Sequence, residues 1–294
     1  MYSRILLASI LFLLLSCSGN DDSPNDNDPQ APAKKYLTSF TNVGENTTDT
    51  LVYSDNRLIL RKEYVGDFLD YNHHFVYNNL NQLIRITKIH STATYPNMET
   101  TYTYYTDGNL KTRHYEGYNS NYTETFTYHD NIIYVNEGTN NEQRINLNLE
   151  GQIVSLDNYF EDVNDFFNTI KFEYGPNGNL TKIAHRYGRN EPYRTFIYTF
   201  DDKINPLFVF DYNLPNGFTI KQLEAVLSQS NYGGYSPGDD DNMFIYFSKN
   251  NFTSIQSENG VGSFNFEYNT ENYPTKISLP YSSNDRYLAL TYQQ

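Results

Sequence analysis

Residues 172–183 read Phe-Glu-Tyr-Gly-Pro-Asn-Gly-Asn-Leu-Thr-Lys-Ile, and this stretch indicates how the chain folds. The alternation Phe-x-Tyr places two aromatic side chains on one face of a strand, because successive side chains point to opposite faces. The Asn-Gly pair that follows tolerates positive φ, which tight hairpins require. The segment from Leu180 to Ile183 is therefore predicted to be a second strand that returns antiparallel to the first.

The same spacing recurs along the chain. In the clearest copies, six residues separate the second aromatic from an aliphatic residue and nine separate it from an Ile. These copies are Phe75-Val-Tyr77 to Leu83 and Ile86, the stretch quoted above, and Phe244-Ile-Tyr246 to Phe252 and Ile255. Looser copies run from Tyr102-Thr-Tyr104 to Leu110, from Leu147 to Ile153, from Phe196-Ile-Tyr198 to Ile204 and from Phe266-Glu-Tyr268 to Ile277. A fixed internal phase repeated this often predicts a repeat architecture.

Turn residues and composition agree with this interpretation. Candidate turns lie at Asn78-Asn79, Asp107-Gly108, Glu150-Gly151 and Asn177-Gly178. The 29 Tyr and 19 Phe suit half-buried strands. We therefore predict an all-β fold, an antiparallel meander of successive β-hairpins that forms an open sheet or a half-barrel.

Residues 206–240 interrupt the repeat. Ile220, Leu223, Val226 and Leu227 have helical spacing and predict one short helix, which a glycine-rich loop at 233–238 follows. This insert either replaces one hairpin or is added to the meander. Because binding residues concentrate on loops carried by a rigid sheet, we expect any recognition to reside here. The alternative is a segment that caps a sheet edge.

The N-terminus is typical of an exported protein. Residues 1–16 combine Arg4 with a short apolar run and predict a signal peptide. Leu-Leu-Ser-Cys at 14–17 resembles the lipobox of bacterial lipoproteins, which implies cleavage between Ser16 and Cys17 and attachment of lipid, palmitate included, to Cys17. Cys17 is the only cysteine, so no internal disulfide can form. Several acyl chains on one residue are enough for stable membrane anchoring.

The residues after Cys17 bear on location. Residues 17–35 contain almost no apolar side chains and predict a disordered tether, followed by a repeat domain at 36–294. Ser18 replaces the Asp of the enterobacterial inner-membrane retention signal, and Asp21-Asp22 resembles the surface-export signal of Bacteroidota lipoproteins. We expect a protein that is lipid-anchored in the outer membrane and exposed at the cell surface. A periplasm-facing anchor, with a spacer of no sorting content, is the alternative.

The Tyr-x-x-x-Gly-x-Leu pattern of residues 174–180 resembles the YD repeat of RHS-type surface proteins. Together with the run from Asp201 to Pro206 and the N-terminal leader, it makes the chain similar to an uncharacterised family of Bacteroidota surface lipoproteins. The resemblance covers roughly residues 50–290 and implies β-hairpin repeats, but no assigned activity. The chain is far too short for the closed shell of RHS toxins and shows no toxin cargo.

The sequence predicts no catalytic residue and no cofactor. Acylation removes Cys17 as a nucleophile, and neither a Gly-x-Ser-x-Gly elbow nor a phosphate-binding loop occurs. Adjacent His73 and His74 would face opposite sides of a strand and could not share a metal. Asp239, Asp240 and Asp241 offer oxygen ligands for calcium but lack EF-hand spacing, so a solvated acidic loop is favoured. Asp49-Thr50-Leu51 resembles a Bacteroidota O-glycosylation site, with Thr50 as the acceptor.

The net charge and the tyrosine content limit the functions that this protein can have. The formal charge of −14 would repel a phosphate backbone, so nucleic acid is excluded as a partner. The tyrosines form either cross-strand ladders, which we favour because Tyr recurs at the structural phase, or a platform for sugars. We predict a non-catalytic, membrane-anchored binding or structural lipoprotein with a glycan or protein ligand. The alternatives are a carbohydrate-binding or carbohydrate-processing accessory protein, an enzyme with two suitably spaced carboxylates included, and a carrier of an apolar ligand.

Overall fold

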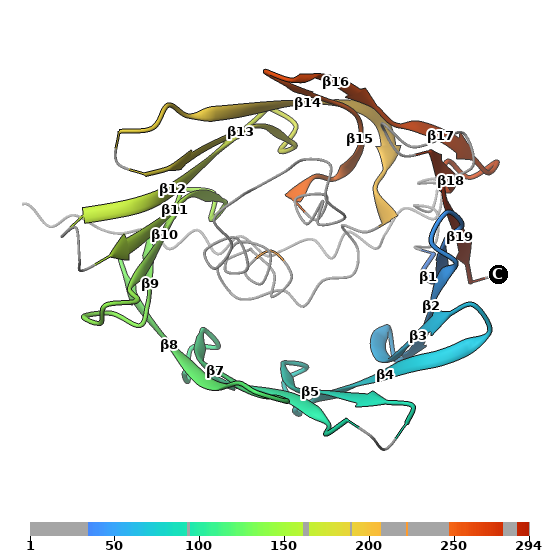
Figure 1. The fold of residues 1–294 in the computed structure, drawn as a ribbon, viewed down its shortest axis with the longest axis horizontal. Helices are drawn as coiled ribbons and strands as arrows, with labels where there is room; N and C mark the ends of the chain where they lie inside the picture. Colours follow the sequence, from blue (N-terminus) through green and yellow to red (C-terminus); the bar gives the residue numbers. More distant parts are fainter. Residues whose placement is uncertain are drawn as a thin grey trace, which may run out of the picture. The chain divides into compact units, whose positions relative to one another are not determined.

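The described residues form one antiparallel sheet of nineteen strands. The computed structural model (Figure 1) describes residues 35–92, 95–160, 165–188, 190–206, 222, 247–278 and 287–293. The strands are β1 (Leu37–Asn42), β2 (Thr47–Ser54), β3 (Arg57–Val65), β4 (Phe68–Tyr77), β5 (Leu83–His90), β6 (Met98–Tyr104), β7 (Leu110–Glu116), β8 (Asn121–His129), β9 (Ile132–Val135), β10 (Gln143–Leu147), β11 (Ile153–Phe160), β12 (Asp165–Tyr174), β13 (Leu180–Tyr187), β14 (Arg194–Ile204), β15 (Asn250–Ser257), β16 (Gly260–Ser263), β17 (Asn265–Tyr268), β18 (Pro274–Ser278) and β19 (Tyr287–Tyr292).

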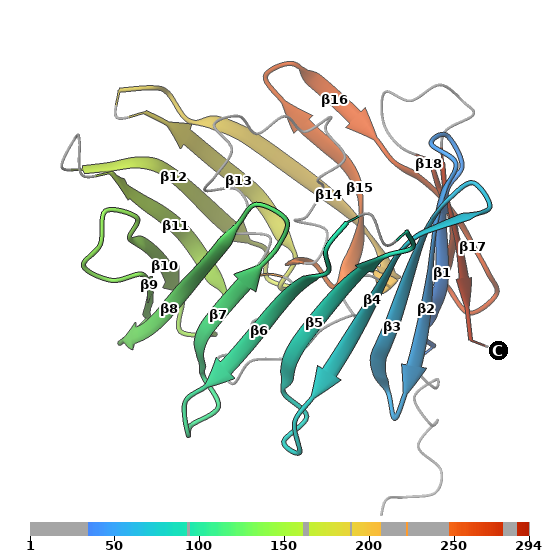
Figure 2. The same ribbon diagram turned by 60° about the horizontal axis from the view of Figure 1, so that its bottom comes forward.

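The strands follow one another as a meander, which confirms the predicted fold class. From β1 to β16 each strand pairs with its successor, and β17, β18 and β19 continue the order. Phe264 alone separates β16, which pairs with β15, from β17, which pairs with β18. The first and last strands also pair, from Leu37 opposite Tyr292 to Asn42 opposite Leu288. The sheet therefore curls further than the open sheet or half-barrel expected from sequence, as Figures 1 and 2 show.

One five-residue turn recurs along one edge of the sheet, at 78–82, 105–109, 148–152, 175–179 and 269–273. In each copy the first residue's N–H donates to the carbonyl of the fifth, and the fourth residue's N–H donates to the carbonyl of the first. The fourth residue always has positive φ and is Gly108, Gly151, Gly178, Asn81 or Asn272. Three predicted Gly turns are thus confirmed. In the Asn78-Asn79 turn, however, the left-handed residue is Asn81, because it holds the fourth position.

Five tyrosines, among them Tyr77, Tyr104 and Tyr174 of the repeat, form a ladder that links neighbouring hairpins. Each donates its hydroxyl proton to a main-chain carbonyl at or near the start of the second strand of the preceding hairpin, at 2.6–3.0 Å. The pairs are Tyr77 to Leu58, Tyr104 to Leu83, Tyr128 to Leu110, Tyr174 to Ile153 and Tyr292 to Pro274. A half-buried ring covers apolar surface while its hydroxyl satisfies a backbone acceptor, which is the favoured ladder interpretation of these tyrosines.

Strand register tests the predicted hairpins directly. Tyr77 pairs with Leu83, and Phe75 pairs with Ile86. The equivalent cross-strand pairs are Phe172 with Ile183, Tyr104 with Leu110, Leu147 with Ile153, and Phe266 with Ile277. The predicted hairpin from Phe196 to Ile204 is wrong, since both residues lie on β14. No turn residue with positive φ separates them, so the strand continues. The copy beginning at Phe244 has its aromatic pair outside the described residues.

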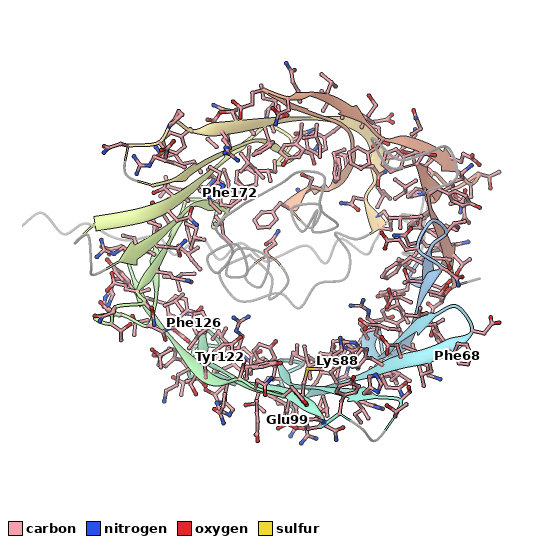
Figure 3. The ribbon with its side chains drawn as sticks, viewed as in Figure 1. Phe68, Lys88, Glu99, Tyr122, Phe126 and Phe172 are labelled. Carbon is pink, nitrogen blue, oxygen red and sulfur yellow. The ribbon has the colours of Figure 1, made fainter. Side chains whose placement is uncertain are left out.

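The inner face of the sheet divides into two halves. Figure 3 shows Lys88, Phe126 and Phe172 on the inner side and Glu99 on the outer side. The repeat turns form what we call the turn edge, and the connections at 66–67, 91–97 and 117–120 lie on the opposite edge, the loop edge. Next to the turn edge the inner face carries the apolar core, with Leu83, Leu110 and Phe126 fully buried. Next to the loop edge, strands β2 to β8 carry charged and aromatic side chains on this face.

Several predictions concern residues outside the described ranges. They are the signal peptide, the cleavage site at Ser16 and Cys17, almost all of the tether, the calcium candidates Asp239–Asp241, and the insert with its short helix except Pro206 and Gln222. Within the described part of the chain, no helix has the length and apolar character needed to cross a membrane.

Candidate functional site

Five ionisable residues meet on the inner face near the loop edge, and we call them the ionic cluster: Asp49, Arg61, Glu63, His73 and Lys88. They come from β2, β3, β4 and β5 and share one face because they occupy cross-strand positions. Arg61 joins the two carboxylates, with Nε 2.6 Å from Asp49 Oδ1 and Nη2 2.8 Å from Glu63 Oε1. His73 Nε2 lies 3.0 Å from Glu63 Oε1, and Lys88 Nζ lies 3.3 Å from Glu63 Oε2.

Burial and neighbouring opposite charges shift the pKa values of this cluster in opposite directions. Burial alone would raise the pKa of Glu63, but the nearby His73, Arg61 and Lys88 outweigh it and lower the pKa to about 2. For Asp49, burial prevails over Arg61 and raises the pKa above its ordinary value. Burial also lowers the pKa of His73, in spite of Glu63. At neutral pH the cluster therefore contains fixed donors and acceptors whose charges are mutually compensated.

An aromatic row, Tyr71, His90, Tyr95 and Tyr118, lies beside the ionic cluster and runs to the loop edge. Lys88 links the two, with Nζ 3.9 Å from the centroid of the Tyr71 ring. Successive ring centroids are separated by 4.8, 4.7 and 6.0 Å, and all three contacts are edge-on. Tyr95 and Tyr118 are 50% and 60% exposed, so the outer end of the row is open to solvent.

The polar inner face continues onto β7 and β8. Arg113 donates from Nε and Nη2 to the two carboxylate oxygens of Glu124, at 2.6 and 2.8 Å. This bidentate pair holds both side chains in one geometry. On the same face, two residues closer to the loop edge, the rings of Tyr115 and Tyr122 stack with centroids 5.3 Å apart.

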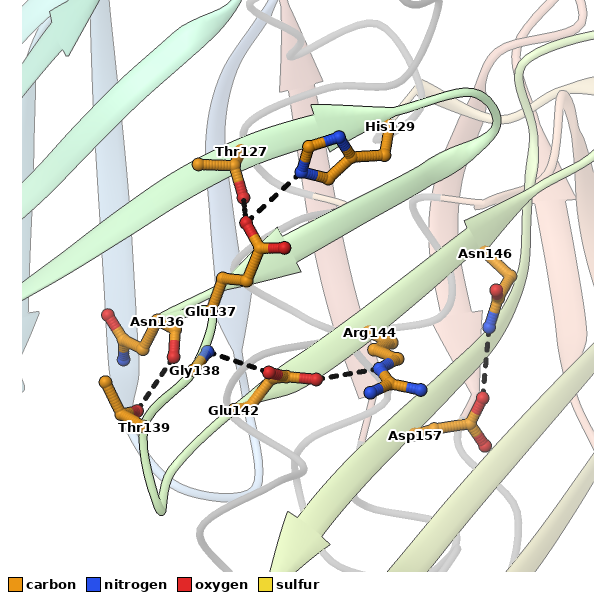
Figure 4. Close-up of polar contacts among 10 residues, drawn as sticks. All are labelled: Thr127, His129, Asn136, Glu137, Gly138, Thr139, Glu142, Arg144, Asn146 and Asp157. Atoms are coloured by element: carbon orange, nitrogen blue, oxygen red, sulfur yellow. Dashed lines mark hydrogen bonds and ion pairs between the residues drawn. The ribbon is translucent and has the colours of Figure 1, made fainter.

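A second set of polar contacts lies on the outer face of β8 to β11 (Figure 4). Glu137 accepts hydrogen bonds from Thr127 and contacts His129, and the hydrogen bond from Thr127 is the main cause that lowers the pKa of Glu137. Glu142 accepts from the Gly138 N–H at 2.8 Å and from Arg144 at 2.7 Å. These contacts close the connection between β9 and β10. Because the carboxylates of Glu137 and Glu142 accept hydrogen bonds from neighbouring groups of the protein, we assign these contacts a structural role.

The remaining predicted site residues do not join these clusters. Thr50 lies on the outer face of β2, while Asp49 and Leu51 on either side of it face inward and are buried. His73 and His74 face opposite sides, with His74 exposed. Among the described residues, no three His, Cys, Asp or Glu side chains gather as a metal site would require.

Sequence patterns did not reveal the ionic cluster or the aromatic row. Their members lie on separate strands, and only the cross-strand register brings them together. Asp49 drew attention only through Thr50, and Tyr71 and Tyr118 fall outside the repeat phase. The sequence does contain a signal for this site. Arg61-x-Glu63 and Tyr71-x-His73 place charged or polar side chains on the strand face where the repeat elsewhere places apolar ones.

Comparisons with known proteins give likenesses in structure only. The chain resembles a porin-like protein from Bacteroides uniformis ATCC 8492, with 11% identity, a TM-score of 0.44, and 87% of this chain and 96% of that one covered. A porin-like protein from Bacteroides vulgatus ATCC 8482 shows 14% identity, a TM-score of 0.40, and coverage of 88% and 99%. The structure of TcdB2-TccC3-TEV matches 55% of this chain at 14% identity and a TM-score of 0.30, and only 11% of that chain is covered. Likenesses at this level describe fold alone. No protein-family model matches the sequence. No curated protein matches it.

Proposed function

We propose that this protein is a non-catalytic, surface-anchored lipoprotein that binds carbohydrate on the loop-side half of its inner face. The observation that supports this most is the aromatic row, whose exposed end lies beside a cluster of ion-paired hydrogen-bonding groups. Aromatic rings offer apolar contact to the C–H faces of a sugar, and charge-assisted donors and acceptors orient its hydroxyls.

The electrostatics favour a neutral ligand. In the ionic cluster Asp49 and Glu63 balance Arg61 and Lys88, so the cluster has no formal net charge when His73 is neutral. The chain as a whole carries −14, which opposes the approach of polyanions. A neutral polyhydroxylated ligand needs neither an excess of cations nor an excess of anions at the site.

The same electrostatics argue against catalysis. A general acid or base works best with a pKa near the operating pH, whereas the pKa of Glu63 is about 2. Asp49 is held by Arg61 at 2.6 Å and is largely buried. The low pKa therefore makes Glu63 unsuited to exchange protons with a bound substrate near neutral pH, and Asp49, whose pKa burial raises, is engaged by Arg61.

Binding to purified protein tests the proposal. We expect Tyr71→Ala and Tyr95→Ala to abolish binding to the neutral glycans that a soluble oligosaccharide array identifies. Tyr193→Ala is the matched control, because Tyr193 is also exposed but contacts Lys171 and Arg186 away from the site. Binding that survives both substitutions, or a wild-type protein that binds no neutral glycan, would refute the proposal.

The lipid anchor is a separate part of the proposal. The described domain begins at the turn edge, since Leu37 pairs with Tyr292 beside the last repeat turn, so a lipidated tether would join the domain there. We expect Cys17→Ala to move the protein from the detergent phase to the aqueous phase, and protease treatment of intact cells to degrade the wild-type protein. A Cys17→Ala variant that still partitions with membranes contradicts lipidation, and full protease resistance contradicts surface exposure.

A further inference from the structure

We infer that the carbohydrate site extends from the aromatic row to a second platform, the stacked rings of Tyr115 and Tyr122, and that the ligand is an extended neutral glycan chain. This inference rests on the proposed function and adds the length and charge of the ligand. It follows from three features of β7, β8 and the connection between them.

The first feature is the platform itself. Tyr115 and Tyr122 are directly opposite each other on β7 and β8, with ring centroids 5.3 Å apart and planes inclined by 29°. Tyr122 is 45% exposed, although it lies within a strand. Neither ring belongs to the tyrosine ladder, whose members are half-buried and bonded to the backbone. The solvent-exposed part of this stacked pair offers apolar surface in addition to that of the aromatic row.

The second feature is Gly117, which lets the Tyr115 ring lie where it does. A Cβ added at Gly117 would collide with the phenol oxygen and ring carbons of Tyr115. Two hydrogen bonds between Gly117 and Ser120 close the tight connection at 117–120. Tyr118 belongs to the same connection and contacts Tyr95 in the aromatic row. One short loop thus positions parts of both platforms.

The third feature is charge. Between the platform and the apolar core, Arg113 and Glu124 neutralise each other in a bidentate pair whose side chains are each only 13% exposed. In the aromatic row, His90 lies 3.2 Å from Asp70. The polar groups along the extended site are therefore paired, which suits a neutral glycan better than an anionic one.

The distance between the platforms indicates the size of the ligand. Tyr71 is on β4 and Tyr122 is on β8, so four inter-strand steps of about 4.8 Å separate their strands, roughly 19 Å in all. A single sugar ring cannot reach from Tyr71, at the inner end of the aromatic row, to Tyr122. A chain that contacts both would gain affinity from each, so its affinity should increase with its length.

Titration calorimetry with cello-, malto- and laminari-oligosaccharides, from disaccharide to hexasaccharide, tests the inference. For the series that binds, we expect affinity to rise with length and then level off. Tyr122→Ala should weaken hexasaccharide binding about tenfold, the loss expected for one removed stacking contact, and leave disaccharide binding unchanged. Tyr71→Ala should abolish measurable binding at every length.

Gly117→Ala provides a second variant that leaves every aromatic residue in place. We expect it to displace Tyr115 and to reproduce the length-specific loss of Tyr122→Ala, while circular dichroism shows an unchanged fold. Length-independent affinity, or equal losses for both lengths in Tyr122→Ala, would overturn the inference and leave the proposed function standing. Binding to none of these series would overturn the inference, and binding to no neutral glycan at all, or only to sulfated glycans or peptides, would overturn both.

Discussion

In the turn-side half of the inner face several hairpins repeat one tyrosine contact, whereas in the loop-side half the described residues of β4, β6 and β8 differ from strand to strand. Tyr104 and Tyr128 make the same hydroxyl-to-carbonyl contact in successive hairpins. Towards the loop edge, the same strands carry unlike residues such as Met98 and Tyr122. The difference indicates that the repeat encodes the scaffold and that departures from it encode the site.

The two halves should also differ in what they contribute to stability. Leu83, Leu110 and Phe126 are fully buried, and each ladder hydroxyl donates to a backbone carbonyl next to this core. The side chains of Arg61 and Lys88 are about 30% exposed, and ion pairs in contact with solvent contribute little. We therefore expect the loop-side half to tolerate substitution.

The largest expected contrast is between Leu110→Ala and Tyr118→Ala. Leu110 is 0% exposed, so removing most of its side chain leaves a cavity and should lower the free energy of unfolding by about 3 kcal/mol. Tyr118 is 60% exposed and lies in a connection, so its replacement should change that energy by less than about 0.5 kcal/mol. Urea unfolding measures both, and similar losses would contradict the division of the inner face.

Much of the scaffold could be predicted from the sequence, because its determinants are local. The six-residue interval from Tyr77 to Leu83 contains one turn and one cross-strand pair, so the sequence pattern and the register carry the same information. The interval from Tyr198 to Ile204 looked equivalent and was not, since β14 continues through it. Spacing alone does not define a turn without a residue that accepts positive φ at the fourth position.

Closure of the sheet and the candidate site could not be predicted in this way. Strands β1 and β19 pair although they lie at opposite ends of the domain, and β1 contains no copy of the repeat. The ionic cluster likewise combines residues of four strands, and an error of one residue in register would turn its members to the outer face. Our prediction that recognition resides at 206–240 stays a prediction, because that segment lies outside the described residues.

A smaller contrast separates two tyrosines by the role of their hydroxyls. Tyr104→Phe removes the 2.6 Å hydrogen bond to the Leu83 carbonyl and should lower the free energy of unfolding by about 1 kcal/mol, because the buried acceptor loses its partner. Tyr95→Phe changes a half-exposed ring near the loop edge and should have no measurable effect. Thermal and urea denaturation provide the comparison. If the two variants lose the same stability, the ladder does not hold the hairpins together.

The two halves should contribute to the free energy of unfolding in different pH ranges. In the loop-side half, burial lowers the pKa of His73 and the pKa of Glu63 is about 2, so the unfolded chain binds protons there more readily than the folded chain. The free energy of unfolding should therefore fall as pH drops below about 6.5, and again below about 4.5. Asp49, with its raised pKa, opposes part of the second decrease.

Burial raises the pKa of Tyr104, Tyr128 and Tyr174 in the turn-side half, and of Tyr71 in the loop-side half, so the unfolded chain loses protons first as pH rises. This contribution to stability is complete below about pH 10 and is lost above it. His73→Gln should flatten the decrease near pH 6.5 and leave the alkaline limb unchanged, whereas Tyr104→Phe should do the reverse. Unfolding curves measured in buffers from about pH 2 to 11 test both limbs. If one substitution alters both limbs, the two halves are electrostatically coupled, and stability and recognition are not encoded separately.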